Sequence, residues 1–297
     1  MDAAGRAAYV ACMPAPWPEL ATVEAFAALS DMDRHALASR LTAALGAGHA
    51  AHPELVGAAR LAAVRHAPTG LLLVAVPGGR HTMGLRDDEI DDARRTLFSQ
   101  DPKQRFDREV GVWHIARTTP AHEVDVGPFL CATGFVHPDG RAESEEEDAS
   151  DEDPCFGSAE VVQLVDVIRG HHLRLLSEAE WEWIAREGGR RSWIVDVAGR
   201  TGMQLDDFND PAENGWGIRR LKSDHGELVA DGWHPSYAGA PSDSRAWDPD
   251  PSGSPGVLRG SHNCWQDDAE AIMCHAAVRG SADGADGAAV RLARDMP

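Results

Sequence analysis

Residues 173–186, L-R-L-L-S-E-A-E-W-E-W-I-A-R, constrain the fold more than any other stretch of this chain. Ser177 and Glu180 stand three residues apart, which is the spacing of a capping box. In that motif the Ser side chain accepts the N–H of the third helical residue, and the Glu side chain accepts the N–H of the cap. The residues that follow, with Trp181 foremost, form a short amphipathic pattern. We therefore expect a capped helix whose tryptophans anchor it in a core.

Other motifs precede and follow this helix in a fixed order. They are V-P-G-G-R-H-T-M-G at 76–84, T-P-A-H-E-V-D-V-G-P-F at 119–129, E-N-G-W-G-I at 213–218, V-L-R-G-S at 257–261, A-V-R-G at 277–280 and V-R-L-A at 290–293. Together with the 173–186 segment, in which Leu176 and Ser177 replace Pro and Thr, this series resembles the formylglycine-generating-enzyme family, also called the sulfatase-modifying factor domain. The resemblance covers about residues 70–297. It implies an α+β, C-type-lectin-like fold.

The chain divides into two parts on this basis. Residues 69–297 form the domain that resembles the family, and residues 1–68 lie outside it. Apolar residues recur at intervals of three and four positions between residues 23 and 45, as on one face of a helix. A second helical pattern runs from Pro53 to His66. We interpret residues 1–68 as a small helical N-terminal extension packed on the main domain. An adaptor module that docks a protein partner is the alternative.

An acidic segment interrupts the main domain. Residues 142–153, A-E-S-E-E-E-D-A-S-D-E-D, contain eight acidic side chains and no large apolar one. Like charges repel, and a segment without apolar surface has nothing to bury. We expect a disordered loop inserted in the domain.

Composition excludes several classes of partner. The net charge is −20 with a pI near 5.0, which argues against nucleic acid and anionic membranes. No run approaches the ~20 apolar residues of a membrane helix. The N-terminus lacks a basic region followed by an apolar one, and the five cysteines are scattered and odd in number. These features predict a cytoplasmic protein with reduced thiols.

The resemblance raises the question of catalysis, because the fold is shared by enzymes and binding proteins. In the copper-dependent oxidases of the family, two thiols bind Cu(I) and activate O₂ to convert a substrate cysteine to formylglycine; soft thiolates suit Cu(I). Cys264 follows the G-S element at the place of the first thiol. Cys274 lies closer to Arg279 than the family's second thiol does. Either an insertion has re-spaced the pair, or the catalytic thiol is lost.

Two candidate metal sites were weighed in the C-terminal part of the chain. Relatives bind structural calcium through a G-N-x-W-E element, and Asp224 and Glu227 fall on the places of its Asn and Glu. Hard oxygen donors of this kind suit Ca²⁺, whereas two surface carboxylates in a turn are the alternative. His262, Cys264, Cys274 and His275 have the residue types of a tetrahedral zinc site, but their spacing matches no strong zinc pattern. Buried Cys and His in a core explain them better.

Further departures from the family pattern favour a binding protein. The run S-D-H-G-E-L at 223–228 lacks both tryptophans of the family's G-N-V-W-E-W, and Gly260 leads directly into Ser261. The leading interpretation is a divergent, non-catalytic module that holds a protein or a small molecule in the family groove, as do the target-binding variable proteins of diversity-generating retroelements. The alternative is a copper-dependent oxidase with Cys264 and Cys274 as its catalytic thiols.

We predict that the two thiols do not form a copper-binding pair, because a longer segment between them separates the two sulfurs. A Cu(I) titration against a competing chelator should give no tight site that is lost in both Cys264→Ser and Cys274→Ser. Mass spectrometry of a cysteine-containing peptide, incubated with copper and O₂, should show no formylglycine. Tight binding that both mutations abolish, together with oxidised peptide, would establish the oxidase instead.

Overall fold

The computed structural model describes residues 17–97, 115–138, 140–142, 156, 158–194, 213–221, 226–250, 256–260, 275–283 and 287–297. The acidic stretch expected as a disordered loop lies outside these residues except for Ala142. No helix in the described part is long and apolar enough to cross a membrane.

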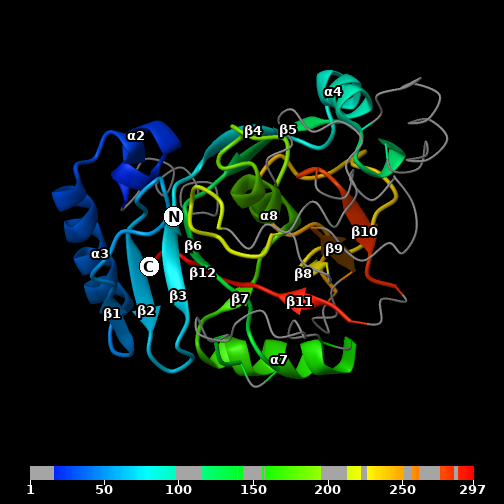
Figure 1. Ribbon diagram of the computed structural model, residues 1–297. Coiled ribbons are helices and arrows are strands. Elements are labelled where there is room, and N and C mark those ends of the chain that lie inside the picture. Colours follow the sequence, from blue (N-terminus) through cyan, green and yellow to red (C-terminus); the bar gives the residue numbers. More distant parts are fainter. Residues whose placement is uncertain are drawn as a thin grey trace, which may run out of the picture.

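A six-stranded sheet forms one half of the molecule (Figure 1). Its strand order is β1-β2-β3-β6-β12-β7, and every neighbouring pair is antiparallel. The strands are β1 (His49–Ala51), β2 (Ala63–His66), β3 (Leu72–Val76), β6 (Phe129–Ala132), β12 (Leu292–Asp295) and β7 (Arg174–Leu175). All four residues of β6 are buried, as is nearly all of β3. The apolar run at 71–76 thus forms a central strand of this sheet, as suits consecutive apolar residues that are buried on both faces.

Two smaller sheets form the other half. The four-stranded sheet has the order β10-β9-β8-β11, with β10 (Arg279–Ser281), β9 (Val257–Arg259), β8 (Glu227–Val229) and β11 (Ala289–Val290). The last pair, β8 with β11, is parallel. The hairpin-like pair of β4 (Gly79–Met83) and β5 (His122–Val126) forms the third sheet. Several of these strands coincide with the short motifs noted in the sequence.

The helices cover the sheets from three sides (Figure 1). A short 3-10 turn, η1 (Pro18–Leu20), leads into α2 (Val23–Ala27) and α3 (Asp31–Leu45), which flank β1 to β3. Helix α4 (Asp87–Leu97) follows β4, and α7 (Ser158–Gly170) lies beside β7. Ser30 separates α2 from α3 through a capping box with Asp33. The apolar period at 23–45 therefore belongs to two helices rather than one.

The helical pattern expected from Pro53 to His66 is wrong. This stretch contains a β-bridge between Val56 and Leu61, followed by β2, which pairs with β3. Ala63 and Val64 are buried, so the apolar residues serve a sheet rather than a helix face. Tertiary pairing has overridden the local pattern. The docking of a partner by residues 1–68 stays a prediction.

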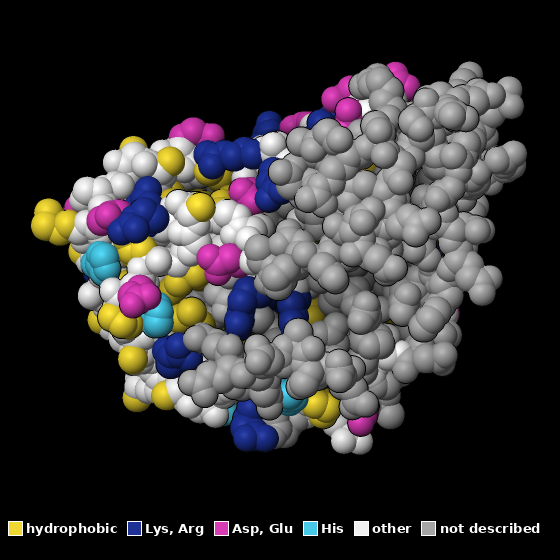
Figure 2. Space-filling model, viewed as in Figure 1, with side chains coloured by type: hydrophobic (Ala, Val, Ile, Leu, Met, Phe, Trp, Pro, Cys, Tyr) yellow, Lys and Arg dark blue, Asp and Glu magenta, His cyan; other side chains and the backbone are white. Residues whose placement is uncertain are grey.

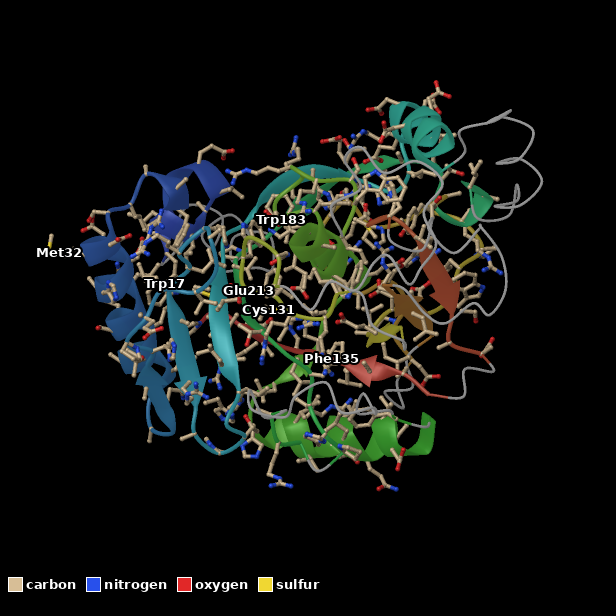
Figure 3. The ribbon with its side chains drawn as sticks, in the orientation of Figure 1. Trp17, Met32, Cys131, Phe135, Trp183 and Glu213 are labelled. Atoms are coloured by element: carbon tan, nitrogen blue, oxygen red, sulfur yellow. The ribbon has the colours of Figure 1, made fainter. Side chains whose placement is uncertain are left out.

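Helix α8 (Glu178–Ala185) lies near the centre of the molecule, and all eight of its residues are buried (Figure 3). Ser177 and Glu180 form the predicted capping box. The Trp183 indole donates to the carbonyl of Pro77 at 2.8 Å and packs against Gly79. A Cβ at Gly79 would come within 2.7 Å of the Trp183 ring, and the residue has φ +155°. Glycine at this position therefore lets the start of β4 approach α8 closely.

The burial of Trp181 yields a stability prediction. Its side chain is 0% exposed, so Trp181→Ala should lower the free energy of unfolding by about 3–5 kcal/mol through lost burial and a residual cavity. Met32→Ala, at a side chain that is 78% exposed on the outer side of α3, serves as the matched control and should change it by less than about 0.5 kcal/mol. Urea melts of both variants measure the difference. A loss under 1 kcal/mol for Trp181→Ala would contradict the role of this residue as a core anchor.

Candidate functional site

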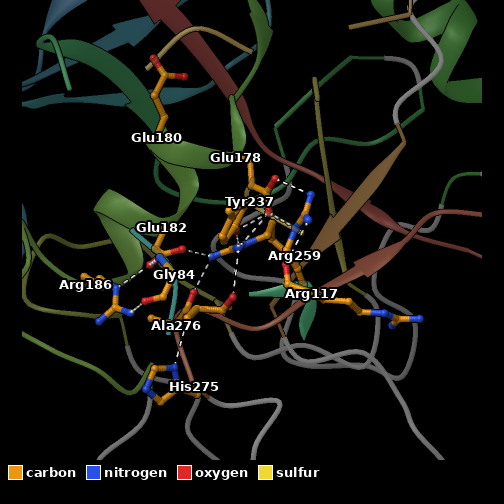
Figure 4. A network of polar contacts seen from close by, with 12 residues as sticks. Gly84, Arg117, Glu178, Glu180, Glu182, Arg186, Tyr237, Arg259, His275 and Ala276 are labelled. Atoms are coloured by element: carbon orange, nitrogen blue, oxygen red, sulfur yellow. Dashed lines mark hydrogen bonds and ion pairs between the residues drawn. The ribbon is translucent and has the colours of Figure 1, made fainter. Parts of the chain in front are cut away.

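Three glutamates of α8 take different directions. Glu178 and Glu182 are four residues apart and share one face of the helix, whereas Glu180 points away from them (Figure 4). Glu180 completes the cap and accepts two hydrogen bonds from Arg174, at 2.7 and 2.8 Å. The other two glutamates point into the protein, where both are almost wholly buried. They form the acidic half of a buried network.

Glu178 binds two arginines and a tyrosine. Arg279 donates to both of its carboxylate oxygens, from Nε at 2.6 Å and from Nη2 at 2.9 Å. Arg259 Nη1 and the Tyr237 hydroxyl donate to Oε1, at 3.0 and 2.8 Å. Burial, and next the neighbouring charge of Glu178, raise the pKa of Tyr237 well above its usual value. The phenol therefore stays a hydrogen-bond donor.

Glu182 completes the network on the next turn of the helix. Its Oε1 accepts from Arg186 Nε at 2.8 Å and from the Gly84 N–H at 2.9 Å, and its Oε2 accepts from Arg259 Nη2 at 2.8 Å. Burial acts to raise the pKa of Glu182, but Arg186 and Arg259 outweigh it and hold the pKa at about 2. Glu182 is therefore a fixed carboxylate, and its negative charge belongs to the fold.

The network also fixes both ends of the segment between β9 and β10. Arg259, at the end of β9, donates to the carbonyls of Ala276 and Ala277, at 2.6 and 3.3 Å. Residues 261–274, which carry Cys264 and Cys274, run between these anchored ends in the sequence. The thiols themselves lie outside the described residues, so their use as a copper pair stays a prediction.

An open pocket lies between α7, the start of α8 and the loop at 243–250. Its volume is about 600 Å³, within the range of small-molecule sites. Apolar side chains contribute most of its surface, and charged side chains of both signs contribute the rest. It is lined by Gly127, Pro128, Phe129, Val165, Ile168, Arg169, Leu173, Arg174, Leu175, Ser177, Glu180, Ala230, Asp243, Ser244, Arg245, Ala246, Pro249, Asp250 and Asp295. We call this cavity the α7–α8 pocket.

Charged side chains in this pocket are held in ion pairs. Arg174 bridges Glu180 and Asp295, with Nε at 2.7 Å from the Asp295 carboxylate. Arg245 lies 3.4 Å from Asp243 on the outer loop. A ligand that enters the pocket thus meets an apolar surface flanked by paired charges, which suits a molecule with an apolar body and a charged group.

Asp231 joins the outer wall of the pocket to α8. Its carboxylate accepts the N–H of Glu178 at 2.6 Å and the N–H of Trp247 at 2.8 Å. Burial, and next the negative charge of Glu178, raise the pKa of Asp231 to about 7. This carboxylate therefore titrates near neutral pH, at the point where the 243–250 loop is attached to the helix.

The structure places one of the two expected calcium ligands. Glu227 is buried in β8, and Arg291 donates to both of its carboxylate oxygens at 2.9 Å. A calcium ion at Glu227 would have to compete with this guanidinium. Asp224 lies outside the described residues, so calcium binding stays a prediction. No group of three or more His, Cys, Asp and Glu side chains in the described part could hold a metal ion.

One feature of the sequence could have predicted the buried network, although the motif comparison did not use it. Arg259 and Arg279 stand in V-L-R-G and A-V-R-G, where each directly follows apolar residues at one end of a short strand. A charge in such a position must find a buried partner, and the acidic residues of the 173–186 segment supply it. The α7–α8 pocket had no comparable signal, because its lining comes from six separate parts of the chain.

Comparison with known proteins supports the fold. No protein-family model and no curated protein matches the chain. The structure is similar to PvdO from Pseudomonas aeruginosa, with a TM-score of 0.55 and 20% sequence identity over 79% of this chain and 98% of PvdO. Treponema denticola variable protein 1 gives a TM-score of 0.46 and 13% identity, over 76% of this chain and 95% of that one. The likeness to PvdO shows the mixed α+β, formylglycine-generating-enzyme-like fold that the motifs predict.

Removal of one charge from the buried network should destabilise the protein. Glu178→Gln keeps the shape of the side chain but leaves Arg259 and Arg279 short of a negative partner, so the free energy of unfolding should fall by about 3 kcal/mol or more. Asp125→Asn is the matched control, because it neutralises the exposed pair with Arg80, and its effect should be much smaller. Urea melts at pH 7 compare the two. Equal effects would mean that the network contributes no more than a surface pair.

Proposed function

We propose that this protein is a ligand-binding module that holds a small molecule, or a side chain of a partner protein, in the α7–α8 pocket. The observation that carries the proposal is the pocket itself. It combines about 600 Å³ of open volume with a mainly apolar surface and flanking charges of both signs.

The surroundings of the pocket support this role. Its inner wall includes Ser177 and Glu180, which cap a helix that is buried along its whole length. Its outer wall is tied to the same helix through Asp231. A binding site whose walls are fixed in advance loses little conformational entropy when a ligand enters. The copper-dependent oxidase is the alternative that the copper titration tests.

Filling the pocket tests the proposal. Ala246 lines the pocket on the outer loop, so Ala246→Trp should occupy its volume, whereas Ala238→Trp adds the same side chain at an exposed position that does not line it. The probes are a set of fragments such as 4-phenylbutyrate and 4-phenylbutylamine, each with an apolar body and one charge. Saturation-transfer NMR should detect binding to the wild type and to Ala238→Trp.

In Ala246→Trp the same signals should fall at least fivefold, while the melting temperature stays within a few degrees of the wild type. Fragments that bind all three proteins equally would show that they bind elsewhere. That result, or no fragment bound by the wild type, would refute the proposal for this pocket.

A further inference from the structure

His81 is a buried histidine without a hydrogen-bond partner. It is the central residue of β4, its side chain is among the buried ones at 6% exposed, and neither of its ring nitrogens has a partner in the described part of the chain. A neutral imidazole presents one donor and one acceptor, and burial of such groups without partners costs free energy. An apolar ring would fill this place without that cost, so packing alone does not account for a histidine here.

The ring of His81 is enclosed where β4 meets α8. Its centroid lies 5.1 Å from that of the Trp183 ring on the helix, with the two planes at 55°. On another side is the turn that follows the helix, where a Cβ added at Gly189 would come within 3.3 Å of the His81 Cβ. The imidazole therefore fills the space between the strand, the helix and the turn.

The hydrogen bonds that attach β4 to α8 lie just before and just after this strand. Before it, the Trp183 indole donates to the Pro77 carbonyl at 2.8 Å. After it, the Gly84 N–H donates to the Glu182 carboxylate at 2.9 Å. Because β4 and β5 form a sheet of their own, this pair can move away from α8 without breaking the six-stranded sheet. His81 stands at the middle of the attachment.

Charged side chains of both signs surround His81. They are Glu182 of α8, Arg186 at the end of α8, Arg259 of β9 and Glu123 of β5. Burial lowers the pKa of His81 to about 4; the two glutamates act against this shift, and the two arginines act with it. Glu182 already accepts hydrogen bonds from both arginines. At pH 7 the imidazole is therefore neutral in the folded protein.

We propose that His81 is an acid-sensitive switch, and that uptake of a proton by its imidazole separates the β4–β5 pair from α8 while the six-stranded sheet stays folded. An imidazolium in the closed structure is a buried charge without a partner of its own, and such a charge is strongly destabilising. It reaches water only when β4 moves away from α8. This device is independent of the α7–α8 pocket and of the function proposed there.

The direction of the pH dependence follows from the two states. A histidine in water has a pKa of about 6.5, whereas burial holds that of His81 at about 4 in the closed structure. The open state therefore binds the proton more tightly. The closed state is fully favoured above about pH 6.5 and loses stability as the pH falls from there through 4.

Hydrogen exchange of the backbone amides at pH 7 and pH 4.5 tests the proposal, with protection factors corrected for the intrinsic exchange rate at each pH. The protection of the Gly84 N–H should fall about tenfold or more at the lower pH, while that of β3 and β6 changes much less. His81→Phe keeps an apolar ring and His81→Gln keeps a neutral polar group, but neither can take up a proton. Both variants should lose most of this pH-dependent difference.

The matched control is the same change at an exposed histidine. His35 lies on the exposed face of α3, and Figure 2 shows surface histidines, in cyan, on that side of the molecule. His35→Phe should keep the wild-type pH dependence at Gly84. If His81→Gln and His81→Phe lose protection at pH 4.5 as the wild type does, the switch is refuted. Equal loss at Gly84, β3 and β6 in the wild type would also overturn it, because acid would then unfold the whole protein.

Discussion

Glu178 and Glu182 carry two negative charges in a core that water does not reach, and much of the structure follows from the need to pair them. A buried charge without a partner costs several kcal/mol, so each must be met by a cation and by further hydrogen bonds. All four of their carboxylate oxygens accept at least one hydrogen bond. Arg259 contacts both glutamates and also stacks over the Trp181 ring at 4.9 Å. The helix, β4, β9 and β10 are consequently held in one arrangement.

The same network gives order to segments that have no regular secondary structure. Residues 230–250 contain neither helix nor strand, yet Tyr237 reaches Glu178, and the His234 carbonyl accepts from Arg279 at 2.8 Å. The Asp231 carboxylate accepts the N–H groups of Glu178 and Trp247, which attaches the loop to the start of α8. His234 and Trp247 stack with their ring centroids 3.6 Å apart. A loop fixed at this many points can serve as a rigid wall, which is how loops commonly carry binding sites on a stable scaffold.

The sequence predicted the elements whose signals are local. The capping box at Ser177 is encoded by adjacent residues and was confirmed. The apolar run of β3 and the apolar spacing of α7 are local signals of the same kind. The helix predicted for residues 53–66 was wrong, because a short strand and a short helix can carry the same few apolar residues, and here part of the stretch pairs with β3. The α7–α8 pocket was not predictable, since it collects residues far apart in the sequence. Arg259 and Arg279 were partly predictable. A charged side chain next to apolar residues signals a buried partner of opposite charge, but only the structure identifies Glu178 and Glu182 as the partners.

Strand β6 borders the proposed binding site. Phe129 at its start lines the α7–α8 pocket. The strand is paired with β3 on one side and β12 on the other. Burial raises the pKa of its Cys131 thiol to about 12, so the thiol stays protonated and unreactive. A buried strand hydrogen-bonded on both edges has little freedom to shift along its axis. The proposed α7–α8 pocket therefore borders a strand that is fixed on both edges, and a binding site with walls fixed in advance loses little conformational entropy when a ligand enters.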